Sequence, residues 1–248
     1  MVRKIFQPFY TAYVIVTFLI SIIVVFPFIL LTSFGANSTS RKVIHTIISC
    51  WSRFWLLIIG MPVSVSGVKF PEGRYIIVAN HISYMDTLII FPAIKGYFRP
   101  LGKKEITRIP VIGFIYKQIV ILVDRSNEVS RAVSMRLMWR VLKKEGNIMI
   151  FPEGTFNETG EPLKEFYNGA FRLAITSQTN ILPLVLADTK NRWHYSGWWK
   201  IQPGRNRVVV LKPISVQGMD MTQLEVVKEQ VYNAMKTELM KYNSHKTL

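Results

Sequence analysis

A histidine and an aspartate stand five positions apart in the stretch NHISYMD, Asn80 to Asp86, directly after the apolar run YIIVA. A neutral imidazole can accept a proton from an alcohol, and a carboxylate on its other nitrogen fixes the tautomer and stabilises the imidazolium that forms. Asn80 supports another interpretation, because asparagine is also a common helix cap. Taken alone, the stretch fits a polar loop as well as a general base, His81, oriented by Asp86.

A second polar turn, FPEGTFN at 151–157, again follows an apolar run. Pro152 and Gly154 favour a tight turn whose backbone N–H groups can bind an anion, and Glu153 is its only charged residue. A structural turn with a solvated glutamate is the alternative. Two polar turns after two strands favour one shared site, because open α/β sheets bind ligands beyond the carboxyl ends of their strands.

Basic residues flank the apolar stretch that lies between these two turns. Lys103, Lys104 and Arg108 precede it, and Arg125 follows it. Cations beside a site at the sheet edge suit a phosphate or carboxylate substrate; a solvated basic face is the alternative, and we favour it for Arg108. The sequence has no serine nucleophile elbow, P-loop, dinucleotide-binding glycine pattern or Cys/His metal spacing. We therefore expect neither a metal nor an organic cofactor.

The hydrophobic pattern predicts the elements that must position these residues. Apolar runs predict five buried strands, at 75–79, 119–123, 147–151, 181–186 and 207–212. Helical patterns cover 127–144, 165–178 and the C-terminal region from residue 222. Because strands alternate with helices, we predict an α/β fold with a mixed, largely buried sheet flanked by helices.

The first 62 residues have a different composition, which predicts a membrane-anchoring helical hairpin. Residues 9–31 are uncharged and long enough to cross a hydrocarbon core of about 30 Å as a helix. Residues 41–65 mix basic, tryptophan and aliphatic residues, as in helices at the lipid–water boundary. For Cys50, the single cysteine, we expect a buried thiol. The predicted organisation is an anchor over 1–62 and an α/β domain over 63–248 that ends in an amphipathic helix.

The charge of the chain indicates its class of partner. Its 248 residues include 31 Lys+Arg and 15 Asp+Glu, a formal net charge of +16, and 50% are hydrophobic. Such a chain favours an anionic membrane, acidic ligands or acidic carrier proteins. We expect no nucleic-acid partner, because zinc-finger spacing and aromatic RNA-binding motifs are missing. We expect an inner-membrane protein whose α/β domain lies on the cytoplasmic side.

Together, these motifs resemble those of the 1-acyl-sn-glycerol-3-phosphate acyltransferases, within the wider glycerolipid acyltransferase superfamily. The resemblance covers residues from about 60 to 215. The family pattern N-H-x4-D matches Asn80, His81 and Asp86, and the pattern F-P-E-G-T matches residues 151–155. A family motif that ends in I-D-R matches residues 123–125, and a proline-containing apolar strand matches residues 181–185.

The resemblance implies direct acyl transfer from acyl-CoA or acyl-carrier protein to the free hydroxyl of 1-acyl-glycerol-3-phosphate, giving phosphatidic acid. It implies that His81 deprotonates this hydroxyl while Asp86 orients the imidazole. A backbone N–H is expected to stabilise the oxyanion. The substrate-binding residues that the resemblance implies are Asn80, Lys103, Lys104, Arg125, Glu153, Gly154 and Thr155.

The chain also departs from the family pattern. Phe156 stands where the family usually has an arginine for acceptor phosphate, and Asn168 replaces another basic residue. Lys103, Lys104 or Arg172 are candidate replacements for the lost charge. A different acceptor, such as a lyso-aminolipid with a free hydroxyl, is therefore a rival hypothesis. A third hypothesis, from another class, is a non-catalytic protein that binds membranes through its basic face.

Overall fold

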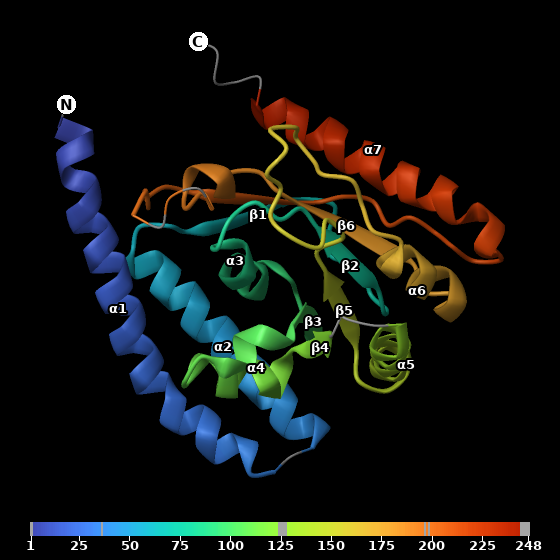
Figure 1. Ribbon diagram of the computed structural model, residues 1–248, viewed down its shortest axis with the longest axis horizontal. Helices are drawn as coiled ribbons and strands as arrows, with labels where there is room; N and C mark the ends of the chain where they lie inside the picture. The colour runs from blue at the N-terminus through green and yellow to red at the C-terminus, as the bar shows by residue number, and fades with distance from the viewer. Residues whose placement is uncertain (1, 36, 124–127, 196, 198, 244–248) are drawn as a thin grey trace.

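A seven-stranded sheet forms the centre of the fold (Figure 1), in the order β1-β7-β6-β2-β5-β3-β4. The computed structural model describes residues 2–35, 37–123, 128–195, 197 and 199–243. The strands are β1 Val63–Gly67, β2 Ile76–Ala79, β3 Phe98–Lys103, β4 Ile121–Val123, β5 Asn147–Ile150, β6 Ile181–Leu186 and β7 Asn206–Val210. Neighbouring strands are parallel except for the β6–β7 pair. The sheet is therefore mixed, which confirms the predicted fold class.

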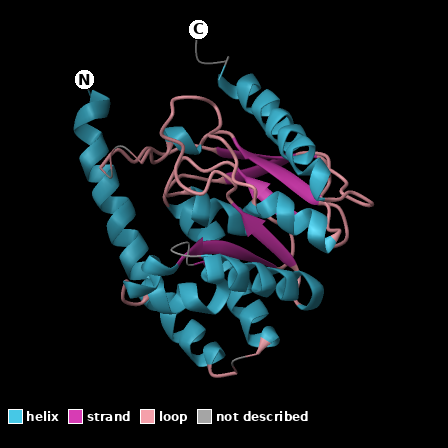
Figure 2. Ribbon diagram, turned by 45° about the vertical axis from the view of Figure 1, so that its right-hand side comes forward, coloured by secondary structure: helices cyan, strands magenta, loops and turns pink. Residues whose placement is uncertain are grey.

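Helices cover both faces of this sheet (Figure 2). They are α1 Val2–Ser33, α2 Ser38–Ile58, α3 Asp86–Ala93, α4 Ile112–Ile119, α5 Glu128–Lys144, α6 Gly169–Ser177 and α7 Leu224–Asn243. Because side chains alternate along a strand, Ile77 and Ala79 of β2 pack in a core with α1 to α4. Ile76 and Val78 of the same strand pack in a second core with α5, α6 and α7. Burial on both faces explains why this strand reads as a continuous apolar run.

Two strands were missed by the hydrophobic pattern, for different reasons. The sequence of β1 is VSVSG, and three of its five residues are exposed because it lies at an edge of the sheet. The sequence of β3 is FRPLGK, and its first half is buried. Its charged residues, proline and glycine interrupt the apolar run by which a buried strand is recognised. The predicted strand at 119–123 begins only at Ile121, because Ile119 is the last residue of α4.

The N-terminal helices α1 and α2 pack side by side (Figure 1). The ring of Phe18 on α1 contacts Trp51 and Trp55 on α2, at centroid distances of 5.7 and 5.3 Å. The most apolar 18-residue window of Phe6–Ser33 has a mean hydropathy of 3.1, and 17% of it is buried. By length and composition, α1 can cross a membrane.

Two expectations for α2 were wrong. The helix ends at Ile58 instead of extending to residue 65, because Gly60 has a φ of 67° and β1 begins at Val63. This left-handed conformation favours glycine and stops a helix. Cys50 is exposed on α2, not buried, because its side of the helix is not covered by α1.

Candidate active site

Asn80 fixes the position of residues 80–86 at the carboxyl end of β2. We call this segment the catalytic loop, because it contains the predicted catalytic pair His81 and Asp86. The side-chain amide of Asn80 donates to the carbonyl of Leu186 at 3.1 Å, and its oxygen accepts the N–H of Leu186 at 2.8 Å. The residue is 4% exposed. Because both polar groups of this buried amide hold the end of β6, we interpret Asn80 as a positioning residue. Its place among the substrate-binding residues stays a prediction.

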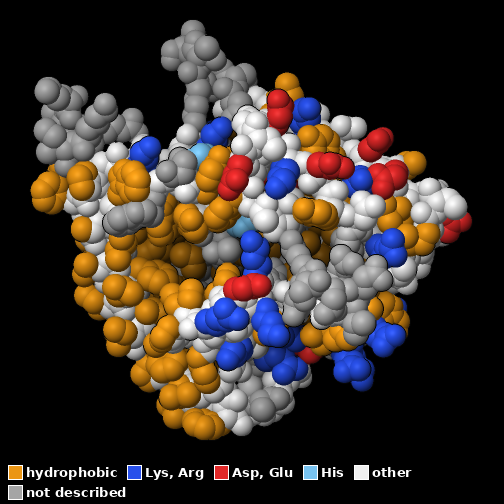
Figure 3. All heavy atoms as spheres, viewed as in Figure 1, with side chains coloured by type: hydrophobic (Ala, Val, Ile, Leu, Met, Phe, Trp, Pro, Cys, Tyr) orange, Lys and Arg blue, Asp and Glu red, His pale blue; other side chains and the backbone are white. Residues whose placement is uncertain are grey.

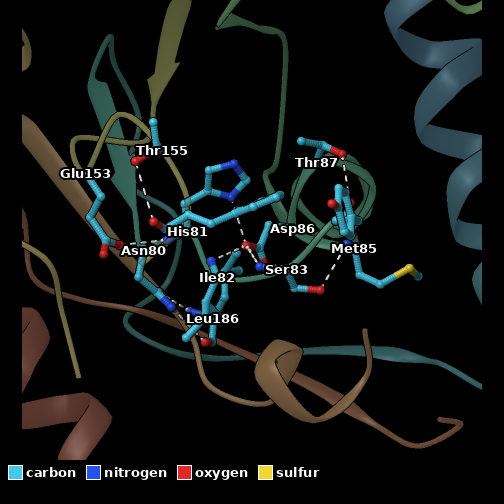
Figure 4. Close-up of polar contacts among 12 residues, drawn as sticks. Asn80, His81, Ile82, Ser83, Met85, Asp86, Thr87, Glu153, Thr155 and Leu186 are labelled. Atoms are coloured by element: carbon cyan, nitrogen blue, oxygen red, sulfur yellow. Dashed lines mark hydrogen bonds and ion pairs between the residues drawn. The ribbon is translucent and has the colours of Figure 1, made fainter. Parts of the chain in front are cut away.

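His81 and Asp86 are in direct contact (Figure 4), with Nδ1 of the imidazole 2.9 Å from Oδ2 of the carboxylate. The same oxygen accepts the backbone N–H groups of Ile82 and Ser83 at 2.7 and 2.8 Å. Asp86 is fully buried in the first turn of α3, whereas the His81 side chain is 15% exposed. The carboxylate therefore favours a proton on Nδ1, which leaves Nε2 as the acceptor.

Glu153 joins the catalytic loop to the FPEGT turn, residues 151–157. One oxygen of its carboxyl group accepts the N–H of His81 at 2.7 Å, and the other accepts the N–H of Lys164 at 2.9 Å. The residue is fully buried, and this burial raises the pKa of the carboxyl group to about 7, although the two backbone N–H groups lower it. We therefore interpret Glu153, too, as a positioning residue, and its predicted role in substrate binding stays a prediction.

The remaining residues of the FPEGT turn adopt a close-fitting conformation beside the loop. Gly154 has a φ of 72°, a left-handed conformation that favours glycine over residues with a side chain. The hydroxyl of Thr155 accepts a hydrogen bond from the Lys164 ammonium at 2.9 Å. The N–H of Asn157 donates to the carbonyl of His81 at 2.9 Å. Both predicted polar turns thus meet at one site, as the sheet-edge argument predicts.

Aromatic side chains form a wall around the imidazole. Phe151 stacks on His81 with the ring centroids 4.1 Å apart, and Phe156 lies 4.5 Å from it at a tilt of 57°. Tyr84 contacts Phe156 at 4.9 Å and Trp193 at 5.1 Å. We call these four residues, Phe151, Phe156, Tyr84 and Trp193, the aromatic wall. It places apolar surface where an arginine side chain would add positive charge.

The segment after β6 reaches this site, which the sequence did not indicate. The hydroxyl of Ser83 donates to the carbonyl of Trp193 at 2.7 Å, and Ser83 forms a β-bridge with His194. Trp193 and His194 belong to the stretch RWHYSGWWK, residues 192–200. The signal that could have placed it is its position just past the end of a central strand, where sites of α/β sheets lie.

Three of the four predicted cations lie at or just after the end of β3. Lys103 ends β3 and Lys104 begins the short 3-10 helix Lys104–Arg108, and all three side chains are exposed. Figure 3 shows Lys and Arg side chains gathered beside a hollow lined with apolar side chains. Arg125 falls outside the described residues, so its predicted role stays a prediction.

Comparison with known proteins identifies the family. A family model described as Acyltransferase matches residues 62–187, slightly more than half of the chain. The 1-acyl-sn-glycerol-3-phosphate acyltransferase of Cocos nucifera is 29% identical over 185 residues, covering 73% of this chain and 58% of that protein. The corresponding alpha enzyme of Mus musculus is 28% identical over 182 residues, covering 72% of this chain and 64% of that protein. The match thus spans about three fifths of these relatives.

The fold has a close counterpart among solved structures. The crystal structure of the 1-acyl-sn-glycerophosphate (LPA) acyltransferase PlsC from Thermotoga maritima superposes with a TM-score of 0.77 at 21% identity. The superposition covers 98% of this chain and 97% of that one, so the N-terminal helices are included. With the family match over residues 62–187, the chain belongs to the acyltransferase family.

Proposed function

We propose that the protein transfers a fatty acyl group from an acyl thioester to the free hydroxyl of 1-acyl-glycerol-3-phosphate, giving phosphatidic acid at a membrane surface. The observation that carries this proposal is the 2.9 Å contact between His81 and the buried Asp86 in the catalytic loop. The relatives in Cocos nucifera and Mus musculus, which are named for acyl transfer to this acceptor, support the choice of substrate.

In the proposed mechanism, Nε2 of His81 takes the proton of the acceptor hydroxyl as the hydroxyl oxygen attacks the thioester carbonyl. The tetrahedral intermediate then collapses, the carbon–sulfur bond breaks, and the imidazolium returns the proton to the departing thiolate. The new ester and the free thiol are the products, and no acyl-enzyme forms. This transfer needs no metal or organic cofactor, because the thioester supplies the activated acyl group and the imidazole moves the proton.

Asp86 supports this step electrostatically. Its carboxylate is held by the Ile82 and Ser83 backbone N–H groups, so it stays fixed while the imidazolium forms next to it. A preorganised charge in a buried site stabilises the developing cation more strongly than a solvated one would. The aromatic wall adds to this effect, because it excludes water from the sides of the His81 ring.

The acyl donor and the orientation of the protein in the membrane are further parts of the proposal. Acyl-CoA and acyl-carrier protein both bear phosphate or carboxylate groups, which suit the exposed Lys103 and Lys104. We propose Gly154 and Thr155 as the part of the FPEGT turn that faces the acceptor. We place α1 and α2 as the membrane anchor and the α/β domain on the cytoplasmic side, where both donors are available.

Phe156 favours a second candidate, a lyso-lipid acceptor whose head carries no phosphate near the reacting hydroxyl. Its ring lies 4.5 Å from the His81 imidazole and contacts Tyr84. An apolar surface at this place does not pair with a phosphate dianion, whereas it accommodates an uncharged backbone such as that of a lyso-aminolipid. Direct competition between the two acceptors distinguishes these candidates.

The test uses the purified full-length chain, labelled acyl-CoA or acyl-carrier protein, and a panel of lyso-lipids with and without phosphate. We expect the His81→Ala variant to lose about 10²–10⁴-fold in kcat, the usual contribution of a general base. His194→Ala is the matched control, because this histidine lies in the same region and its backbone bridge to Ser83 is kept when the side chain is shortened. Full activity of His81→Ala would overturn the mechanism, and inactivity of the wild type on every pair would favour the non-catalytic hypothesis.

A further inference from the structure

A groove of about 990 Å³ lies between α2, the end of β1 and the end of α3. It is distinct from the candidate active site. Asp86 begins α3, whereas the groove is lined by Phe91, Pro92 and Ala93 at the other end of this eight-residue helix. The two ends are about 12 Å apart at 1.5 Å per residue. No residue of the catalytic loop or the FPEGT turn lines the groove.

The charged residues that line the groove are all positive. Lys42 and Arg53 come from α2, Lys69 follows β1, and Lys95 follows α3. All four side chains are exposed, and the groove lining includes no Asp or Glu. Among the residues that the structure describes, none of the four forms an ion pair. Four unneutralised cations around one hollow attract an anionic ligand.

The walls of the groove are apolar. Val65, Val68, Phe70, Phe91 and Pro92 contribute side chains to them. The apolar surface continues outside the groove along α2, where Val43, Phe54 and Leu57 are 45%, 67% and 55% exposed. Because α2 packs against α1, which can cross a membrane, this stripe gives the groove an apolar route from a bilayer.

Two polar side chains of α2 line the same groove. Nε2 of His45 and Oγ of Ser49 are buried and have no hydrogen-bond partner among the described residues. His45 is 5% exposed, and its burial lowers the pKa of the imidazole to about 4, so it is neutral near pH 7. Buried polar atoms normally have a partner, and a ligand with polar oxygens would supply one after a small rearrangement.

We propose that this groove binds an anionic phospholipid from the bilayer, with its phosphate among Lys42, Arg53, Lys69 and Lys95 and its acyl chain on the apolar wall. Positive charge alone would suit many anions. The combination with an apolar wall, continuous with the exposed stripe of α2, selects an anionic amphiphile that arrives from a membrane. This lipid site is separate from acyl transfer at His81.

The chain carries its own probe for this site, because Cys50 is its single cysteine and lines the groove exposed to solvent. The experiment measures the rate of Cys50 alkylation by N-ethylmaleimide in the full-length protein, followed by intact mass. The protein is kept in a neutral detergent, and dihexanoyl phosphatidylglycerol or dihexanoyl phosphatidylcholine is added below its micelle concentration. We expect the anionic lipid to slow alkylation and the zwitterionic lipid to leave the rate unchanged.

Paired variants test the charge requirement. Lys69→Gln combined with Lys95→Gln removes two groove cations, and each loss should weaken protection about five-fold, or about 25-fold together. Arg140→Gln combined with Lys143→Gln is the matched control, because it removes the same charge from exposed positions of α5 outside the groove. These exposed substitutions should leave the unfolding temperature unchanged.

Three results would overturn the proposal. They are equal protection by the zwitterionic lipid, equal protection by inorganic phosphate at the same concentration, or the same loss of protection in the groove and α5 variants. Protection in His81→Ala should equal that of the wild type. The lipid site can therefore fail without affecting the proposed acyl transfer, and acyl transfer can fail without affecting the site.

Discussion

Hydrogen bonds and aromatic contacts surround His81 in different ways. We call Asp86, which contacts the ring, and Glu153, which accepts the backbone N–H, the carboxylate side of His81. Both residues are fully buried, and the backbone N–H groups of the neighbouring turns donate to both. On the other side, the ring faces Phe156, which contacts the 43% exposed Tyr84. The first side is fixed by hydrogen bonds, and the second is shaped by aromatic contacts.

This difference separates chemistry from specificity. Buried hydrogen-bonded groups allow little change, because an unmade bond leaves a desolvated polar group. Aromatic contacts at a partly exposed surface tolerate substitution with a smaller loss. Changes on the carboxylate side should therefore reduce kcat for every acceptor, whereas changes on the aromatic side should alter the choice of acceptor.

Asp86→Asn should give the largest effect on activity. The substitution keeps the size of the side chain but removes the negative charge 2.9 Å from Nδ1 of His81, so the imidazolium is no longer stabilised. We expect kcat to fall by about 10²–10⁴-fold for all acceptors, with little change in KM. Steady-state kinetics with two different lyso-lipids measures this, and an acceptor-dependent loss would break the proposed separation.

Glu153→Gln tests the same side through stability. Because the pKa of Glu153 is raised on folding, the folded state binds this proton more tightly than the unfolded state does. The resulting contribution to the free energy of unfolding is complete below pH 4.5 and is lost as the pH rises through about 7. Between these values the wild type should lose up to about 3 kcal/mol of unfolding free energy from this group. The Glu153→Gln variant should lack this pH dependence, as denaturant unfolding at pH 4.5 and pH 7.5 would show. An identical pH profile in both proteins would contradict the prediction.

The sequence predicted the carboxylate side well because that side is local. His81 and Asp86 are five residues apart, and a helix that begins at Asp86 brings the carboxylate back to the ring. The contact of Glu153 with the His81 N–H was not predictable, because it depends on the pairing of β2 with β5. We interpret Glu153 as a positioning residue because it is buried. A sequence motif does not show whether a single glutamate is buried.

The aromatic side was not predictable because it combines distant segments. Tyr84 and Trp193 meet only because β6 lies beside β2 and the chain turns back over the catalytic loop. The hydrophobic pattern gave the buried strand β6 with its observed bounds, since burial on both faces leaves a clear signal. Exposed or partly exposed positions leave no such signal. The strand β1 was therefore missed, and the expectation that Cys50 is buried was wrong.

Phe156→Arg tests whether the aromatic side selects the acceptor. The new guanidinium would bring a charge-assisted donor for phosphate near His81, an interaction of about 1.5–3 kcal/mol. We expect KM for 1-acyl-glycerol-3-phosphate to fall by about ten-fold, with a smaller change for an acceptor without phosphate. Phe156→Leu is the matched control, because it removes the ring without adding charge. Equal effects of both variants on both acceptors would show that Phe156 acts only by packing.

Lys103→Gln and Lys104→Gln should give the smallest effects, because both side chains are exposed and exposed charge pairs contribute about 1 kcal/mol or less. We expect each variant to raise KM by about two- to five-fold at low salt, with kcat unchanged. The difference from the wild type should disappear near 0.5 M salt, where charges at the surface are screened. Measuring KM for the donor and for the acceptor separately shows which substrate these cations attract. A fall in kcat with an unchanged KM would instead place them on the chemical side of the site, and the division between the two sides of His81 would then be wrong.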